Sequence, residues 1–228
     1  MCWNNSQRIS FNSRMSQMLK PALLKVDALH FRYPDCLLFG GLSFEIHPGV
    51  TLVRGGDGCG KSTLLRLLAG TLEPQSGTLC INNVSAHEQP GVYRAQVFWA
   101  DPQSTAFEQT TVRDYLAVQS SQHAGFDQQI LASAIEGLGL EPHIHKALFM
   151  LSTGTKRKVW LAAAFACGAA ITLLDEPFAA LDGPSIAFVM QQLTKAARQT
   201  QRACVLADYV APAGIALASV IDVGKQAA

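Results

Sequence analysis

Hydrophobic and polar residues alternate in segments 23–33 and 37–46 of this 228-residue chain. This period-two pattern predicts strands, and the Pro34-Asp35 turn between them predicts a hairpin. A continuous apolar segment is typical of a strand that a parallel sheet buries on both faces, and 171–174 has this character. Further strands are expected at 50–53, 78–81, 92–100, 203–207 and 218–223.

Other segments show the spacing of amphipathic helices. Apolar residues recur at helical spacing between 111 and 150, which predicts a small helical lobe inserted into the core, at about 104–155. Helices are also predicted at 64–69, where Gly70 ends the helix, and at 184–199. The expected fold is therefore α/β, with a mixed or parallel sheet flanked by helices, an N-terminal antiparallel β subdomain and the inserted lobe.

The length suits one domain with a core of its own. Hydrophobic residues make up 49% of the chain, but no segment reaches the ~20 continuous apolar residues that a membrane-spanning helix needs. The longest apolar segment, 159–174, contains Gly168 and is predicted to form two buried elements. A formal net charge of +1 gives no reason to expect nucleic acid as a partner.

The cysteines indicate the redox compartment of the protein, and the first residues indicate where the folded domain begins. The six cysteines show no C-x-x-C pairing, which argues against a disulfide framework and favours a reducing compartment. Residues 1–21 begin with a polar stretch that lacks the apolar core of a signal peptide. They are predicted to be a disordered leader, or to lie ahead of a true start at Met15 or Met18, before a domain at 22–226.

The most informative segment is Gly55-Gly56-Asp57-Gly58-Cys59-Gly60-Lys61-Ser62-Thr63. It follows a predicted strand and opens a predicted helix, as a G-x-x-x-x-G-K-S/T phosphate loop does. Glycines let main-chain N–H groups turn toward phosphates, and the helix N-terminus adds its positive dipole end. Lys61 is expected to reach the β- and γ-phosphates, and Ser62 to place its hydroxyl on Mg²⁺. The core is thus expected to be that of a P-loop NTPase; a glycine-rich turn without function is the alternative.

A pair of acids narrows the chemistry. Asp175 and Glu176 follow the apolar segment 171–174 directly. Asp175 would hold Mg²⁺ through water, and Glu176 would polarise the attacking water. Acids in this position also serve as helix N-caps, which is the alternative when they are considered without the phosphate loop.

The segment Leu151-Ser152-Thr153-Gly154-Thr155 precedes the acids by about twenty residues. In this order and spacing, the chain resembles the ATP-binding subunits of ABC transporters, whose signature is Leu-Ser-Gly-Gly-Gln. Ser152 and Gly154 match that signature, whereas Thr153 and Thr155 depart from it. The chemistry needs a hydroxyl and main-chain N–H groups at a helix N-terminus, aimed at a γ-phosphate. Taken without its neighbours, the segment would be an ordinary helix N-cap.

The resemblance, which spans about 23–223 and is nearest to compact exporter-type subunits, implies further roles. Tyr33 would stack on adenine, or would be a core tyrosine. Gln103 would sense Mg²⁺ and the lobe interface. Ser152 and Gly154 would contact an ATP held by a second subunit, so that two subunits enclose ATP head to tail. A membrane-spanning subunit would be the other partner, and the chain would lie in the cytoplasm at the inner face of a membrane.

One family position is not matched. The family has a histidine after the strand expected at 203–207, and no histidine follows His145 in this chain. Tyr209 aligns best with that position and Asp208 is the next candidate; a tyrosine that only packs is the alternative. A phenol donates one hydrogen bond but supplies no imidazolium charge at neutral pH, so turnover is expected to be slow. Asp57, where asparagine is usual, adds a negative charge to the phosphate loop.

The resemblance therefore implies an ATPase that uses ATP and Mg²⁺ to power transport through a separate membrane subunit. The alternative is an ABC-type switch that binds ATP, turns over slowly and regulates a complex without transport. A P-loop small-molecule kinase is a third reading, but it would lack the element formed by Ser152 and Gly154. The transported substrate, the direction of transport and the choice between homodimer and heterodimer are not contained in this sequence.

Overall fold

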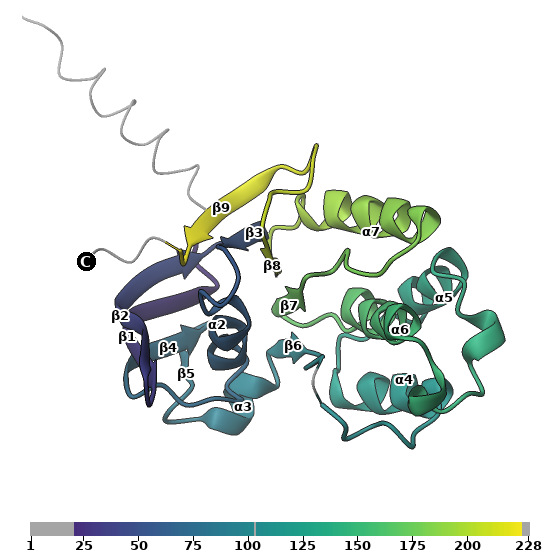
Figure 1. Cartoon of the computed structure of the whole chain (residues 1–228), viewed down its shortest axis with the longest axis horizontal. Helices are drawn as coiled ribbons and strands as arrows, with labels where there is room; N and C mark the ends of the chain where they lie inside the picture. Colours follow the sequence, from purple (N-terminus) through teal and green to yellow (C-terminus); the bar gives the residue numbers. More distant parts are fainter. Residues whose placement is uncertain (1–20, 103, 225–228) are drawn as a thin grey trace, which may run out of the picture.

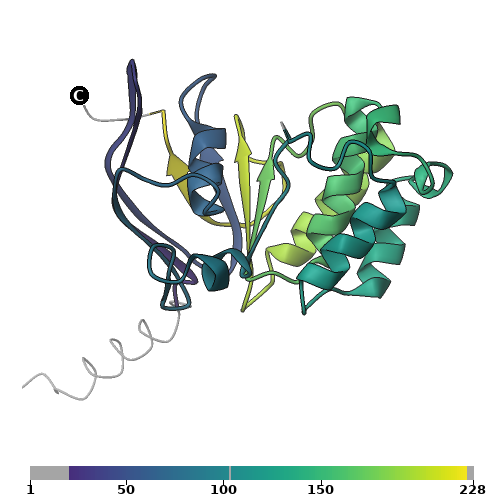
Figure 2. The same ribbon diagram turned by 90° about the horizontal axis from the view of Figure 1, so that it is seen from below.

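An antiparallel sheet, a parallel sheet and a group of helices form successive layers (Figures 1 and 2). The computed structural model describes residues 21–102 and 104–224. The antiparallel sheet has the order β2-β1-β4-β5, and the parallel sheet has the order β6-β7-β8-β3-β9. The strands are β1 (Leu24–Tyr33), β2 (Cys36–Ile46), β3 (Gly49–Arg54), β4 (Ser76–Ile81), β5 (Val84–Ser85), β6 (Val97–Trp99), β7 (Ile171–Asp175), β8 (Ala203–Asp208) and β9 (Leu217–Asp222).

The helices are divided between the two faces of the parallel sheet (Figure 2). On the face toward the antiparallel sheet lie α2 (Lys61–Leu68) and α3 (Pro90–Arg94). On the other face lie α4 (Val112–Gln122), α5 (Gln128–Gly137), α6 (Thr153–Ala166) and α7 (Gly183–Ala196). Short 3₁₀ turns occur at Glu141–His143 and Leu148–Met150. None of the helices in the described part of the chain is long and apolar enough to cross a membrane.

Alternate residues of the parallel strands point into different cores, as the period of two requires. On β3, Val53 packs in the core that surrounds α2, whereas Leu52 packs in the core of the other helices. On β8, Val205 and Leu206 divide in the same way. Both faces of the sheet are therefore buried, which explains why its strands are continuous apolar segments in the sequence.

The first hairpin confirms the prediction for 23–33 and 37–46, with one local departure. Ala28 has a φ of 46°, and the pairing register of β1 shifts between Val26 and Leu29. Because this bulge inserts one residue, Val26 and Leu29 are both buried while Ala28 is exposed. The alternation expected over 23–33 is therefore wrong at the bulge, although the strand itself is present.

The apolar segment 92–100 is not one strand. Its first residues belong to α3, and only Val97–Trp99 forms β6. Pro90 occupies the first turn of α3, where its missing N–H costs no hydrogen bond. Tyr93 is fully buried and donates a hydrogen bond of 2.9 Å to the main-chain carbonyl of Leu68, which anchors α3 against α2. Pro90 therefore favours a helix start, and this tertiary contact holds the helix against α2.

The helical lobe lies where helical spacing predicted it. Thr111 and Asp127 cap the N-termini of α4 and α5 with their side-chain oxygens. The following helix, α6, packs against both α4 and α5 as well as α7. The segment 159–174 contains the end of α6 and β7 except for its last residue, so the prediction of two buried elements is confirmed.

Candidate nucleotide-binding site

The phosphate loop joins β3 to α2. Gly58 and Gly60 have φ values of 68° and 96°, a region that favours glycine, and Gly60 directly precedes α2. At Gly55 a Cβ would stand 2.3 Å from the Cys59 Sγ, so the loop folds closely on itself there. The loop is therefore a cradle that larger residues would fill, as phosphate binding requires.

Lys61 is the first residue of α2, and only 7% of it is exposed. Its Nζ donates hydrogen bonds of 2.9 Å to the main-chain carbonyls of both Gly55 and Gly56. The ammonium group is thus held inside the loop, at the N-terminal end of the helix.

Asp175 stands at the carboxyl end of β7, next to Ser62 at the start of α2. The Ser62 hydroxyl hydrogen-bonds to the Asp175 carboxylate. Burial raises the pKa of Asp175, and the hydrogen bond from Ser62 partly opposes that rise. A hydroxyl and a carboxylate are oxygen donors of the kind that Mg²⁺ takes, so these residues fit the ion that the family implies.

Glu176 begins the loop after β7 in an uncommon backbone conformation. Its φ is 45°, which few residues other than glycine adopt. Its N–H donates a 2.9 Å hydrogen bond to the Ala207 carbonyl at the end of the neighbouring β8. The adjacent strand therefore helps to hold the main chain of the second acid in place.

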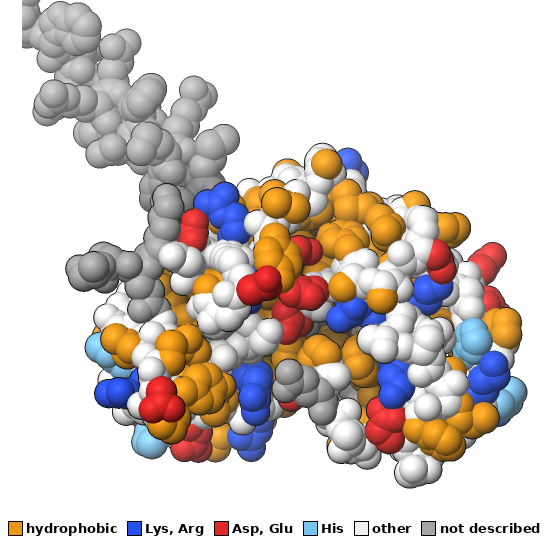
Figure 3. Space-filling view, viewed as in Figure 1, with side chains coloured by type: hydrophobic (Ala, Val, Ile, Leu, Met, Phe, Trp, Pro, Cys, Tyr) orange, Lys and Arg blue, Asp and Glu red, His pale blue; other side chains and the backbone are white. Residues whose placement is uncertain are grey.

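A hollow of about 310 Å³ lies beside Ser62. Its lining comes from several elements: Tyr33, Ser62, Thr63, Arg66, Trp99, Asp101, Pro102, Arg157, Asp175 and Glu176. In the space-filling view, acidic side chains gather near the middle of this face, and the surface is notched between its two halves (Figure 3). The fold thus brings Tyr33, Ser62, Thr63, Asp175 and Glu176 together, as the sequence predicted.

Some residues of this hollow carried no role in the sequence analysis. Arg66 and Trp99 line it, and the Arg66 Nε and Trp99 Nε1 are buried with no hydrogen-bond partner within the described residues. Arg66 is the polar residue between the apolar residues of α2, and Trp99 ends a short strand, so neither belongs to a motif. Tyr33 lies beside the loop helix, its phenol 3.5 Å from the Thr63 hydroxyl oxygen.

Tyr209, just after β8, lies over the phosphate loop. Its phenol donates a hydrogen bond to the Asp57 carboxylate, and the centroid of its ring is 4.2 Å from the Lys61 Nζ. The hydrogen bond to Asp57 raises the pKa of Tyr209 to about 12. Asp208, the other candidate for this position, accepts a 2.7 Å hydrogen bond from the N–H of Tyr209. The tyrosine, and not the aspartate, is therefore the residue that reaches the lysine.

The signature residues begin α6, which packs on the opposite face of the parallel sheet from α2. Ser152 caps this helix, and its hydroxyl accepts a 3.2 Å hydrogen bond from the N–H of Thr155. A Cβ on Gly154 would lie 2.4 Å from the Ala180 carbonyl oxygen, so the residue must be small. The structure does not bring Ser152 and Gly154 to the hollow beside Ser62.

Arg157 links this helix to the acidic pair. Its Nη1 donates a 2.6 Å hydrogen bond to the carbonyl of Ala179, in the loop that follows Glu176. It also lines the hollow beside Asp175. The sequence shows Arg157 only as one member of a basic run, so its role there could not be recognised. Gln103 lies outside the described residues, and its assignment stays a prediction.

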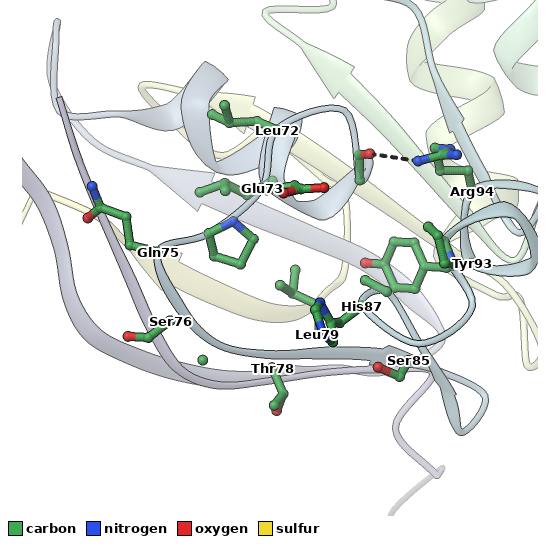
Figure 4. Close-up of a pocket in the computed structure, with 16 residues that line it drawn as sticks. Leu72, Glu73, Gln75, Ser76, Thr78, Leu79, Ser85, His87, Tyr93 and Arg94 are labelled. Carbon is green, nitrogen blue, oxygen red and sulfur yellow. Dashed lines mark hydrogen bonds between the residues drawn. The ribbon is translucent and has the colours of Figure 1, made fainter.

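A larger cavity, of about 400 Å³, lies near the opposite end of α2 (Figure 4). Leu79 and Tyr93 line it, and Arg94 donates a 3.5 Å hydrogen bond to the Gly70 carbonyl at its margin. It shares no lining residue with the hollow beside Ser62. Size alone would therefore direct attention away from the phosphate loop.

Comparisons with known proteins agree with this site. The family described as "ABC transporter" matches residues 39–179. The chain is 32% identical to the cytochrome c biogenesis ATP-binding export protein CcmA of Pseudomonas savastanoi pv. phaseolicola over 73% of this chain and 79% of that protein. It is 31% identical to the hemin import ATP-binding protein HmuV of Pseudomonas aeruginosa, over 81% and 83% of the two chains.

A solved structure described as the ATP-binding subunit of an ABC transporter superposes with a TM-score of 0.74 at 22% identity, covering 82% of this chain and 80% of that one. This likeness shows the fold. The family match and the relatives show more: the chain belongs to the ABC transporter family of ATP-binding subunits. The expected class, an ATPase that powers transport with a membrane subunit, is confirmed at the level of the family.

Proposed function

We propose that this chain binds Mg-ATP in the hollow beside its phosphate loop and hydrolyses it as one half of an ATP-enclosing dimer that drives a membrane transporter. The observation that carries the proposal is the convergence of Lys61 and Ser62, at the start of α2, with Asp175 at the end of β7 and Glu176 directly after it. Phosphoryl transfer to water needs a lysine at a helix N-terminus, two side chains that hold Mg²⁺ and a carboxylate that orients the water.

Each of these side chains has a separate task. Lys61 would exchange its bonds to the Gly55 and Gly56 carbonyls for bonds to phosphate oxygens. Ser62 and Asp175 would hold Mg²⁺, which neutralises charge on the β- and γ-phosphates when bound. Glu176, whose main chain is held by β8, would orient the attacking water and accept its proton.

The dimer is proposed because the signature residues of a single chain lie away from its own phosphate loop. Ser152 is exposed at the N-terminus of α6, on the far side of the sheet from Lys61. Main-chain N–H groups and a hydroxyl at a helix N-terminus form an anion site. We propose that this site receives the γ-phosphate of an ATP held by a second copy or by a similar chain, and that Gly154 permits the close approach.

A membrane-spanning subunit would receive the resulting motion, with this chain bound to it at the cytoplasmic face of the membrane. The helical lobe is the favoured contact, because α6 connects it to the signature residues and, through Arg157, to the acidic loop. Export is favoured by several relatives that are named cytochrome c biogenesis ATP-binding export proteins, although the relative HmuV is named for hemin import.

A second function, a slow ATP switch that regulates a complex, is favoured by one observation. Tyr209 stands near Lys61 where the family has histidine, and its phenol is bonded to Asp57. A transition-state contact of this kind is commonly worth ~2–3 orders of magnitude in rate. In this reading ATP would still assemble the dimer, while phosphate release would be negligible.

Phosphate release from the purified chain with Mg-ATP, measured against protein concentration beside Glu176→Gln, tests the proposal. A rate that rises more steeply than linearly, and that is lost in Glu176→Gln, supports a dimeric ATPase. A rate equal to that of the variant, with ATP-dependent dimers by light scattering, supports the switch instead. Absence of both ATP binding and dimers would refute both functions.

A further inference from the structure

The positions where this chain departs from its family near the phosphates contact each other. Asp57 replaces the usual asparagine and Tyr209 the usual histidine, and they are 152 positions apart in the sequence. The Tyr209 phenol donates its hydrogen bond to the Asp57 carboxylate. A phenol has one O–H to donate. While Asp57 accepts it, Tyr209 has no donor left for a phosphate.

The same contact places the aromatic ring on the catalytic lysine. The ring centroid is 4.2 Å from the Lys61 Nζ, within the range of a cation–π interaction. The ammonium group also donates to the carbonyls of Gly55 and Gly56. Of its three donors, two are used by the loop itself. Together with the Tyr209 ring, these two bonds give the Lys61 ammonium group partners without any phosphate.

The negative charge of Asp57 also opposes phosphate binding. Asp57 lies in the loop whose main chain would surround the phosphates, and a carboxylate there repels them. The phenol of Tyr209 is protonated at neutral pH, as an ordinary tyrosine is, and its bond to Asp57 raises its pKa further, to about 12.

We propose that Asp57 and Tyr209 form a latch that closes the empty phosphate loop, with Asp57 as the positioning residue for the Tyr209 ring. Nucleotide phosphates reach Lys61 only after the ring moves aside, so the latch weakens nucleotide binding. This inference rests on the proposed function, because it assumes that Lys61 binds phosphate. It assigns Asp57 a role in nucleotide affinity that is separate from any role of Tyr209 in hydrolysis.

Binding of Mg-ADP by calorimetry isolates the latch, because ADP reaches Lys61 with its β-phosphate but has no γ-phosphate for Tyr209 to contact. We expect Tyr209→Phe to bind Mg-ADP about three- to tenfold more tightly, from the loss of one exposed hydrogen bond to a charged group. Asp57→Ala should also bind more tightly. Val210→Ala, at the exposed neighbouring residue, is the matched control and should leave the affinity unchanged.

A double-mutant cycle separates the latch from simple charge repulsion. If the residues act together, Asp57→Ala in the Tyr209→Phe background gains at least threefold less affinity than in the unmodified chain. If Asp57 acts only through its charge, the gain is the same in both backgrounds, and the latch is wrong. Equal or weaker Mg-ADP binding by Tyr209→Phe would also overturn it. Thermal unfolding of each variant confirms that the fold is retained.

The outcomes distinguish this inference from the proposed function. An unmodified chain that binds no Mg-ADP would refute the nucleotide site itself and the latch with it. If the unmodified chain binds Mg-ADP and Lys61→Ala does not, the proposed nucleotide site is supported whatever the double-mutant cycle shows. Tighter binding together with slower phosphate release in Tyr209→Phe would show that Tyr209 has both roles, since a merely structural residue would not move the two in opposite directions.

Discussion

Arg157 donates a 2.6 Å hydrogen bond to the main-chain carbonyl of Ala179, and thereby joins the helix that begins at the signature to the loop that follows the acidic pair. The helix and the loop are otherwise separated by β7 in the sequence. Arg157 also lies beside Asp175 in the hollow, where its positive charge lowers the pKa of that carboxyl, against the larger effect of burial. The pair thus connects the proposed dimer contact to the place of hydrolysis.

We expect Arg157→Met to slow phosphate release by about tenfold or more, because a charge-assisted hydrogen bond of this kind contributes about 1.5–3 kcal/mol. Mg-ADP binding should change much less, since Arg157 makes no contact with the phosphate loop among the described hydrogen bonds. Steady-state phosphate release and calorimetry measure the two effects. Arg113→Met, on the exposed side of α4, is the control; a loss of equal size there would contradict the assignment.

Gly154 and Gly183 offer a matched pair of glycines, each in the first turn of a helix. A Cβ on Gly154 would meet the Ala180 carbonyl at 2.4 Å, whereas a Cβ on Gly183 would meet nothing within 4 Å. Gly154→Ala should therefore lower the free energy of unfolding by about 1–3 kcal/mol. Gly183→Ala should raise it by about 0.4–1 kcal/mol, because alanine restricts the unfolded chain. Urea denaturation measures both changes.

The two substitutions also separate packing from function. Gly154→Ala should abolish ATP-dependent dimerisation in light scattering if this glycine permits the approach of a second subunit. Gly183→Ala should dimerise normally. Dimers of ordinary stability in Gly154→Ala would show that the residue serves packing against Ala180 alone.

The ion pair of Lys156 and Glu108 is largely buried. The Lys156 Nζ lies 2.6 and 2.9 Å from the two carboxylate oxygens, and the side chains are 20% and 27% exposed. Removing one partner leaves the other desolvated, so Glu108→Gln or Lys156→Met should each cost about 1–2 kcal/mol of stability. The double variant should cost less than the sum of the two.

An exposed pair in the same chain provides the comparison. Lys25 and Glu45 approach to 3.3 Å, with side chains 62% and 48% exposed. Their removal should change the free energy of unfolding by no more than about 0.5 kcal/mol. Urea denaturation at low and high salt is the measurement. The prediction is wrong if both pairs contribute equally to the free energy of unfolding. It is also wrong if salt weakens the Lys156 pair as strongly as it weakens the Lys25 pair, because burial would then have no effect.

Much of the site could be predicted because its functional residues lie in short contiguous segments of the sequence. The phosphate loop and the acids each follow an apolar strand directly, and parallel strands deliver such residues to one edge of a sheet. The order of the motifs along the chain then indicated the family. Local patterns also predicted the lobe, because α4 and α5 repeat apolar residues at helical spacing over several turns.

What could not be predicted depends on contacts between distant residues. The bond from Tyr209 to Asp57 spans 152 positions, and no local pattern indicates it. Arg157 belongs to a basic run whose members have separate partners: Lys156 pairs with Glu108, Arg157 with the Ala179 carbonyl, and Lys158 with Asp182. The helical part of 92–100 is likewise held in place by the bond of Tyr93 to Leu68, a residue of another helix.

Asp182 joins α7 to α6, and its protonation at low pH should lower the free energy of unfolding. One carboxylate oxygen accepts a 2.9 Å hydrogen bond from the N–H of Ser185 at the start of α7, and the other a 2.5 Å bond from the Lys158 Nζ. The bonds from Lys158 and then Ser185 hold the pKa of Asp182 well below its ordinary value. The unfolded chain therefore binds the proton first as the pH falls: the stabilisation is complete above the unfolded pKa of about 3.9 and is lost progressively as the pH falls from there toward the lower pKa of the folded chain.

At pH 7 we expect Asp182→Ala to lower the free energy of unfolding by about 1 kcal/mol, as the loss of an N-cap does. Asp182→Asn should lose less there, because its amide oxygen still caps α7. The difference between Asp182→Asn and the unmodified chain should shrink as the pH falls from about 5 to about 3, since the carboxylate that distinguishes them becomes protonated in the unfolded chain. Urea denaturation across this range measures it, and a difference that stays constant would show that the ion pair with Lys158 contributes nothing to stability.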